Sequence, residues 1–231
     1  MLIALPNMDG SFTCTLFFPW EGKPSFGSIK TDQDVMDFFN EVFPDVVPLM
    51  PDLVEEYFGN PTASLCIIRC FPWTYKDKVA LIGDAAHAIV PFYGQGMNAG
   101  FEDCSVLNAI LDETDEDWLT SFKRYEIARK PNGDAIAELS KRNFIVMRDK
   151  TGDPEFLLQK KIEGRFSAKY PDRWMPLYSQ VTFSHIPYHE ALAAGERQDK
   201  LMEEIMAIPN IEEKWDSEEV EQRMLELSVK I

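Results

Sequence analysis

The sequence is poor in basic residues. It has 23 Lys and Arg against 39 Asp and Glu, which gives a formal net charge of −16. Nucleic acids and anionic bilayers attract positively charged surfaces, so this balance argues against either as a partner of the chain as a whole. Much of the acidic excess lies in residues 203–221, where a solvated helix or tail explains it without any function.

Several motifs are missing as well. There is no run of about eighteen apolar residues and no secretory signal, so we expect a soluble chain. The G-x-S-x-G elbow of the hydrolases is absent, and no G-x-G-x-x-G turn for a dinucleotide follows a strand. Cys66 and Cys70 form a C-x3-C pair without the further Cys or His pair of a zinc site. We therefore expect no metal, and buried, reduced thiols at all four cysteines.

The hydrophobic pattern predicts strands first and helices afterwards. Turn-forming residues at 7–10 separate two strand-like runs within residues 1–20, and Thr31 or Asp32 is a good cap for a helix over residues 32–42. This order favours an α+β fold over repeated βαβ units. The further elements we expect are strands over 64–70 and 79–82, a helix starting at Gly96, and helices over 118–129, 134–150 and 154–169.

Alternation along the first two strands places Ile3 and Leu5 on one face, and Thr13, Thr15 and Phe17 on one face of the other strand. An apolar pocket wall and an ordinary core sheet both fit this pattern. The pattern alone favours the core.

The stretch LIGDAAHAIVPFYGQGMNAGFED, residues 81–103, combines unusual features. Asp84 follows a short apolar run, and an ionised carboxylate there suits ligand hydroxyls and would repel a phosphate. Gly94 and Gly96 allow a planar ligand to approach the main chain at the start of a helix, where unpaired N–H groups carry partial positive charge. A tight loop without a ligand is the alternative.

The segment VALIGDAAHAIVPFYGQGMNAGFEDC resembles the second FAD-binding motif of the class A flavoprotein aromatic hydroxylases, the para-hydroxybenzoate hydroxylase-like family. MLIALPNMDGSFTCTLFFPW, RNFIVMR and PLYSQVTFSHIPYHEAL resemble, in order, the branch of that family that acts on L-kynurenine. The resemblance implies the second half of the family's FAD-binding fold, followed by helices. It divides the chain into a substrate-binding sheet portion (residues 1–72), an FAD-binding segment (73–114) and a helical C-terminal region (115–231).

The resemblance also assigns roles. Asp84 would bind the ribityl hydroxyls of FAD, and Gly96, Met97 and Asn98 the edge of the flavin ring, while His87 is expected to be structural. It raises the pocket-wall interpretation of the first two strands above the core. The residues expected to border the substrate are Ile3, Leu5, Thr15, Phe17, Pro91, Phe92, Tyr93, Gly94, Asn143, Met147 and Tyr178.

The activity implied is oxidation of an aromatic ring. In the family NADPH reduces FAD, and O2 adds to the reduced flavin as a C4a-hydroperoxide that hydroxylates L-kynurenine to 3-hydroxykynurenine, a step of tryptophan degradation towards NAD. The cofactor carries the difficult step, so no side chain is assigned as catalytic. Another aromatic hydroxylase of this class, and a non-catalytic binding module, are the alternatives.

The sequence departs from the family pattern in three ways. The first G-x-G-x-x-G unit, the Arg and Tyr that bind the substrate carboxylate, and a hydrophobic membrane anchor are not found. We therefore expect a central-to-C-terminal portion that binds FAD weakly without an N-terminal half as its partner. For a full-length enzyme the resemblance implies the mitochondrial outer membrane.

Overall fold

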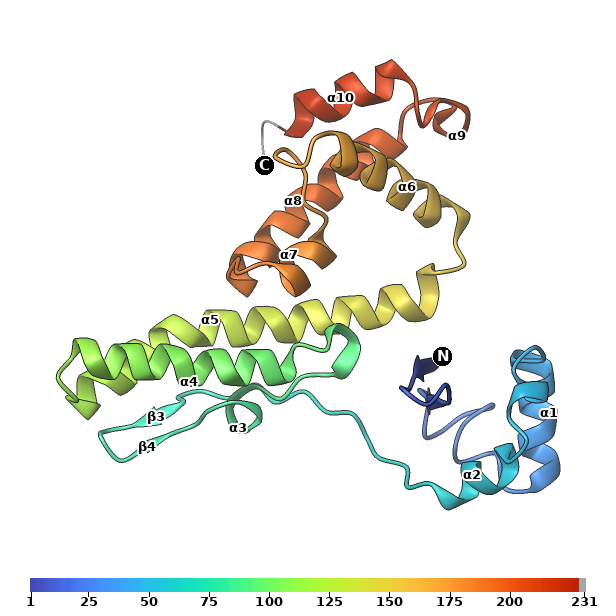
Figure 1. Cartoon of the computed structure of the whole chain (residues 1–231), viewed down its shortest axis with the longest axis horizontal. Helices are drawn as coiled ribbons and strands as arrows, with labels where there is room; N and C mark the ends of the chain where they lie inside the picture. The colour runs from blue at the N-terminus through green and yellow to red at the C-terminus, as the bar shows by residue number, and fades with distance from the viewer. Residues whose placement is uncertain (229–231) are drawn as a thin grey trace. The chain divides into compact units, whose positions relative to one another are not determined.

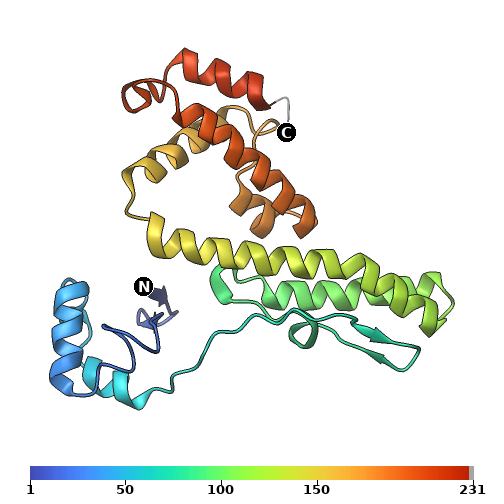
Figure 2. The same ribbon diagram turned by 180° about the vertical axis from the view of Figure 1, so that it is seen from behind.

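The computed structural model describes residues 1–228, which fall into two compact units, one over Met1–Ser64 and one that starts at Leu65. Figure 1 shows the course of the chain, and Figure 2 shows it from behind. Each unit has one antiparallel hairpin followed by helices, so the predicted α+β class is confirmed. The division into three segments after residues 72 and 114 stays a prediction.

The first unit begins with an antiparallel hairpin of β1 (Leu2–Pro6) and β2 (Phe12–Leu16), as predicted. Gly10 closes the turn at φ +86°, a conformation that side chains disfavour. Ile3 lies opposite Thr15, and Leu5 lies opposite Thr13. Because opposite residues of a ladder share a side, these four residues form one face of the hairpin.

The core of the first unit is built on the other face. Leu2 and Leu16 pack against a cluster that contains Val35, Phe38 and Phe39. These three residues come from α1 (Asp32–Val42), and the cluster is completed from η1 (Val47–Leu49) and α2 (Leu53–Gly59), two helices that the pattern did not predict. The face with Ile3 and Thr15 is therefore turned away from the unit's own core.

Thr31 caps α1, as predicted. Its hydroxyl accepts a hydrogen bond from Asp34 N at 3.2 Å, and the Asp34 carboxylate accepts one from Thr31 N at 2.9 Å, which makes a capping box. Replacing Thr31 by Ala should lower the free energy of unfolding by about 1 kcal/mol, measured by urea titration. Glu41→Ala, at an exposed position of the same helix, is the control and should change it by less than about 0.5 kcal/mol. Equal losses for the two variants would contradict the capping role.

The second unit starts with a small hairpin and continues in helices (Figure 1). The long helices α4 and α5 run side by side in both views, and the start of α8 packs on α5. Its elements are β3 (Thr74–Tyr75), β4 (Val79–Ala80), α3 (Asp84–His87), η2 (Pro91–Tyr93), α4 (Gly96–Glu113), α5 (Trp118–Ile145), η3 (Val146–Lys150), α6 (Pro154–Lys169), α7 (Leu177–Phe183), α8 (Tyr188–Met206), α9 (Ile211–Lys214) and α10 (Glu218–Ser228).

Two strand predictions need correction. Residues 64–70 form no strand, since no ladder partner faces them within residues 1–228 and the backbone bond from Ile68 N to Ala88 O, at 2.9 Å, does not extend into a ladder. The strand expected over 79–82 is confined to Val79–Ala80, which pairs antiparallel with β3. Asp84 therefore follows a hairpin and begins the one-turn helix α3; it does not end a strand of a parallel sheet.

The predicted break between residues 129 and 134 is also wrong, because α5 continues through Pro131. A proline inside a helix costs about 3 kcal/mol. Tyr125, Ile136 and Leu139, on the two sides of it, are fully buried against neighbouring elements, and this burial outweighs the cost.

The cysteines are free, but their predicted burial is wrong. Cys14, Cys66 and Cys104 are exposed, and Cys70 is half-buried. The prediction inferred burial from apolar neighbours in the sequence. Cys66 instead lies in the unpaired segment before β3, and Cys104 lies on the open face of α4.

Candidate functional site

An open cleft lies in the second unit where α3, η2 and the start of α4 meet. Its volume is about 570 Å³, within the range of small-molecule sites. Five of the predicted site residues line it: Asp84, Pro91, Gly94, Gly96 and Met97. The lining is completed by Gly83, Ile89, Gly100, Phe101 and Cys104.

The glycines that line the cleft are required for different reasons. Gly83 (φ +60°) and Gly94 (φ +67°) adopt conformations that favour glycine, and a Cβ on Gly83 would lie 3.8 Å from the Cα of Gly100. These glycines are explained by the fold alone. A Cβ on Gly96 would meet only Ile89, at an ordinary 3.6 Å, so the chain itself does not require glycine there. A bare main chain at Gly96 fits the close approach of a ligand.

The start of α4 also fits a ligand. Gln95 occupies the cap position, but its side chain does not cap the helix. Its Oε1 instead accepts hydrogen bonds from Asn98 Nδ2 at 2.9 Å and from the hydroxyl of Tyr188 at 3.1 Å. No side chain within residues 1–228 therefore caps the first N–H groups of α4, where the helix dipole favours an electron-rich group.

The apolar face of α4 is open towards the cleft. Met97 is 69% exposed and Phe101 is 65% exposed, although their helical spacing is that of a core face. The buried side of α4 instead carries Ala99, Asp103 and Ile110. An exposed apolar surface beside uncapped N–H donors suits a flat, partly polar ring.

A second group of predicted residues lies around η2. Asn143 Nδ2 donates to the carbonyl oxygen of Phe92 at 2.8 Å and contacts Met147 Sδ at 3.7 Å. The rings of Tyr93 and Tyr178 stack with centroids 5.5 Å apart. Burial, together with Tyr178 and Asp199, raises the pKa of Tyr93 to about 12, so this phenol stays protonated at neutral pH. Two sets of contacts, Phe92 with Asn143 and Met147, and Tyr93 with Tyr178, thus meet at the neighbouring residues Phe92 and Tyr93 of η2.

The remaining predicted residues belong to neither group. Asn98 is exposed at the start of α4 and is held by Gln95. Ile3, Leu5 and Thr15 belong to the β1–β2 hairpin of the other compact unit, and Phe17 follows β2.

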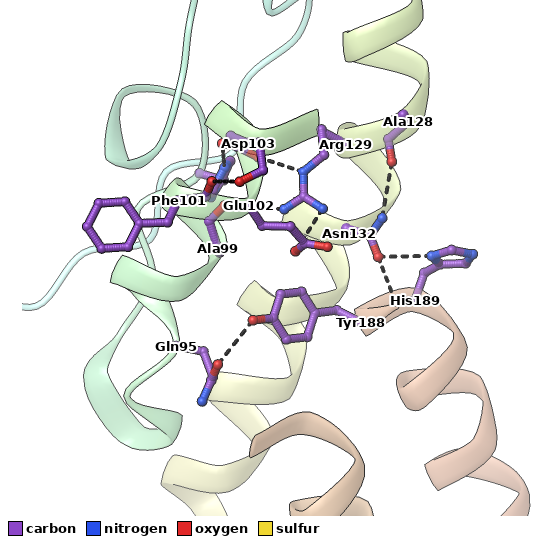
Figure 3. Close-up of polar contacts among 12 residues, drawn as sticks. Gln95, Ala99, Phe101, Glu102, Asp103, Ala128, Arg129, Asn132, Tyr188 and His189 are labelled. Atoms are coloured by element: carbon purple, nitrogen blue, oxygen red, sulfur yellow. Dashed lines mark hydrogen bonds and ion pairs between the residues drawn. The ribbon is translucent and has the colours of Figure 1, made fainter. Parts of the chain in front are cut away.

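The sequence analysis missed a buried ionic cluster beside the cleft, drawn in Figure 3. Asp103 is fully buried and accepts hydrogen bonds from Arg129 Nε at 2.7 Å, His87 Nε2 at 2.6 Å and Gly83 N at 3.0 Å. Arg129 also pairs with Glu102 at 2.8 Å. A signal was present, because Asp103 occupies the same helix face as Ala99 and Ile110, where an acid needs a partner.

The charge state of this cluster follows from its contacts. Burial by itself raises the pKa of Asp103, but the hydrogen bonds from His87, Arg129 and Gly83 together hold that pKa below its ordinary value. Asp103 is therefore ionised and can only accept. It follows that Nε2 of His87 carries a proton. His87 is buried under Trp73 at a ring distance of 5.2 Å, which is the environment of a structural residue.

The start of α8 is joined to α4 and α5 by polar contacts. Tyr188 reaches Gln95, and both the main-chain N and the Nδ1 of His189 lie within 3.3 Å of Asn132 Oδ1 (Figure 3). Within residues 1–228, no group of acids, cysteines and histidines is arranged to hold a metal ion, and no helix has the length and hydropathy to cross a bilayer.

Comparison with known proteins defines the class of this site. Residues 71–140 match the family described as FAD binding domain, a span that contains every residue lining the cleft. The cleft therefore lies in a segment similar to an FAD-binding domain, and the predicted cofactor, FAD, is confirmed.

The particular relatives are kynurenine 3-monooxygenases, and similarity to them confirms the predicted resemblance. The chain is 60% identical to the protein of this name from Flavobacterium johnsoniae over 98% of its own length and 51% of the relative's. It is 47% identical to those from Cytophaga hutchinsonii (100% of this chain, 51% of the relative) and Dictyostelium discoideum (89% and 47%). The chain thus spans about half the length of these relatives.

Proposed function

We propose that this chain supplies the flavin-ring and substrate sides of an FAD-dependent monooxygenase that consumes NADPH and O2 to convert L-kynurenine to 3-hydroxykynurenine. The observation that supports this most strongly is the cleft itself. Three of the four residues expected at the cofactor, Asp84, Gly96 and Met97, border one open space within the part of the chain that matches an FAD binding domain.

The cofactor would be held by two features of the cleft. The exposed carboxylate of Asp84 would accept hydrogen bonds from the ribityl hydroxyls, and the uncapped start of α4 at Gly96, Met97 and Asn98 would donate to the electron-rich edge of the ring. When bound, FAD supplies the redox chemistry and the activation of oxygen. The chain's own task is to orient the ring and to stabilise negative charge at its edge.

The substrate would be held by the residues around η2. Asn143 donates to Phe92 through Nδ2, so its Oδ1 is the acceptor that an amino-acid ammonium group would meet. By the resemblance, the hydroxyl of Tyr178, half exposed beside Tyr93, would bind the same end of the substrate. Pro91 and Gly94 would border the reacting ring on the cleft side, and Met147 would supply an apolar contact.

The β1–β2 hairpin would cover the aromatic ring of the substrate. The face that carries Ile3, Leu5 and Thr15 is turned away from the hairpin's own core, which leaves it available for such a wall, with Phe17 beside it. Covering the ring would exclude water from the reaction. The mitochondrial outer-membrane location concerns a full-length enzyme and stays a prediction.

The test is a chimera in which this chain replaces the aligned half of the Flavobacterium johnsoniae relative, which is 60% identical to it. We expect the purified chimera to retain FAD, to oxidise NADPH when L-kynurenine is added, and to form 3-hydroxykynurenine, as followed by absorbance and chromatography. The unaltered relative is the positive control. NADPH oxidation without hydroxylated product would refute the substrate, and a flavin-free, folded chimera would favour a non-catalytic binding module.

A further inference from the structure

We infer that Asp103 is a positioning residue for Asp84, because its carboxylate holds both ends of the short helix that begins with Asp84. This inference rests on the proposed role of Asp84 in binding FAD. It assigns a function to a buried residue that lies outside the lining of the cleft.

The helix α3 needs outside support. It contains only four residues, Asp84–His87, and a single turn of helix is not stable without tertiary contacts. Inside the turn, the N–H groups of Ala86 and His87 bond to the carbonyl oxygen of Gly83, each at 2.9 Å. The main chain at Gly83 has φ +60° and ψ −137°, so the entry into the turn is a conformation that few residues adopt.

Asp103 supplies that support from α4. Its Oδ2 accepts from the N–H of Gly83, directly before Asp84, and also from Nε2 of His87, the last residue of the turn. The direction in which Asp84 leaves the main chain is therefore fixed at both ends by one oxygen atom. Oδ2 is itself fixed, since Oδ1 of the same carboxylate is held by Arg129, only 2% exposed, from α5 (Figure 3).

The chemistry requires a carboxylate at this position. Three donors converge on Asp103, and only a group with two accepting oxygens meets all of them. In Asp103→Asn one oxygen is replaced by an NH2 group, so at least one N–H of Gly83, His87 or Arg129 faces another donor. The side chain keeps its size, so the change acts on the hydrogen bonds and leaves the packing of α4 on α5 in place.

A double-mutant cycle in the chimera separates positioning from general stability. FAD dissociation constants are measured by flavin fluorescence for the unsubstituted chimera, Asp103→Asn, Asp84→Ala and the double variant. We expect Asp103→Asn to weaken FAD binding about tenfold or more in the presence of Asp84, and less than about threefold in its absence. A merely structural role would give the same factor in both backgrounds.

Two further variants keep the test decisive if Asp103→Asn folds poorly. His87→Phe keeps the ring against Trp73 but releases the end of α3 from Asp103, and should also weaken FAD binding through Asp84. His87→Gln restores a donor at the position of Nε2 and should recover most of the affinity. Ile205→Val, in the separate core of α6, α8, α9 and α10, is the control that lowers stability without changing the dissociation constant.

The outcomes are distinguishable. If the unsubstituted chimera binds no FAD, both the proposed function and the role of Asp103 are refuted. If it binds FAD and the Asp103 and Asp84 effects multiply independently, or His87→Gln binds no better than His87→Phe, the positioning role alone is refuted.

Discussion

Replacing Asp84 by Ala should weaken FAD binding in the chimera by about 10- to 100-fold. A hydrogen bond to an ionised group contributes about 1.5–3 kcal/mol, and the variant removes the carboxylate expected to receive the ribityl hydroxyls. Asp84 is exposed on the first turn of α3, and its side chain makes no hydrogen bond within residues 1–228. Its removal should therefore leave the fold intact. The measurement is a fluorescence titration of FAD, accompanied by a thermal unfolding scan.

Asp77→Ala is the matched control for this prediction. Asp77 lies in the turn between β3 and β4, outside the cleft lining, and pairs with exposed Lys78 at 2.8 Å. The substitution removes the same charge from the same unit, but a surface ion pair contributes at most about 1 kcal/mol to stability and should not affect FAD. Equal dissociation constants for Asp84→Ala and the unsubstituted chimera would rule out a cofactor contact at Asp84.

Arg129→Met should lower the free energy of unfolding by about 3–5 kcal/mol. Methionine fills a similar apolar volume, but it leaves the fully buried carboxylate of Asp103 without its cationic partner, and breaking a buried ion pair has a cost of that size. Denaturant unfolding followed by circular dichroism measures the loss. Arg124→Met is the control. Arg124 lies on α5 as well and pairs with Glu113 of α4 at the exposed surface, so its loss should lower the free energy of unfolding by less than about 1 kcal/mol.

The loss caused by Arg129→Met should depend on pH. In the folded chain the pKa of Asp103 is below its unfolded value of about 3.9, so its contribution is fully present above that value and is lost as the pH falls through the folded pKa. Removing Arg129 removes one of the groups that lower this pKa. The difference in stability between variant and wild type should therefore be larger at pH 7 than near pH 3, and a pH-independent difference would contradict the assignment.

The sequence predicted elements whose signals are local. The capping residue Thr31, the turn at residues 7–10, and the helix starts at Gly96 and Pro154 each depend on neighbours within a few positions, and each is confirmed. Residues 64–70 and Pro131 depended on distant partners instead. An apolar run becomes a strand only where a ladder partner exists, and a proline breaks a helix only where packing does not hold the helix together.

The candidate site divides in the same way. Resemblance named the residues expected at the cofactor and the substrate, and the structure joins Asp84 with Gly96 in one cleft and Asn143 with Phe92 in one cluster. Asp103 and Arg129 escaped the analysis because their partners are 16 to 30 residues distant in the sequence. Their pattern, an acid on a buried helix face, became informative only once the face of α4 was known.

Because α5 continues through Pro131, the number of residues between two positions fixes both their distance and their relative direction around the helix. Arg129 and Asn143 lie on this one helix, and a rise of 1.5 Å per residue separates them by about 21 Å along its axis. Inserting one residue between them would rotate Asn143 by about 100° around the helix and take it away from Phe92. If the helix ended at Pro131, the spacing of the two residues would depend on the conformation of a hinge. In the continuous helix it depends on the number of residues between them.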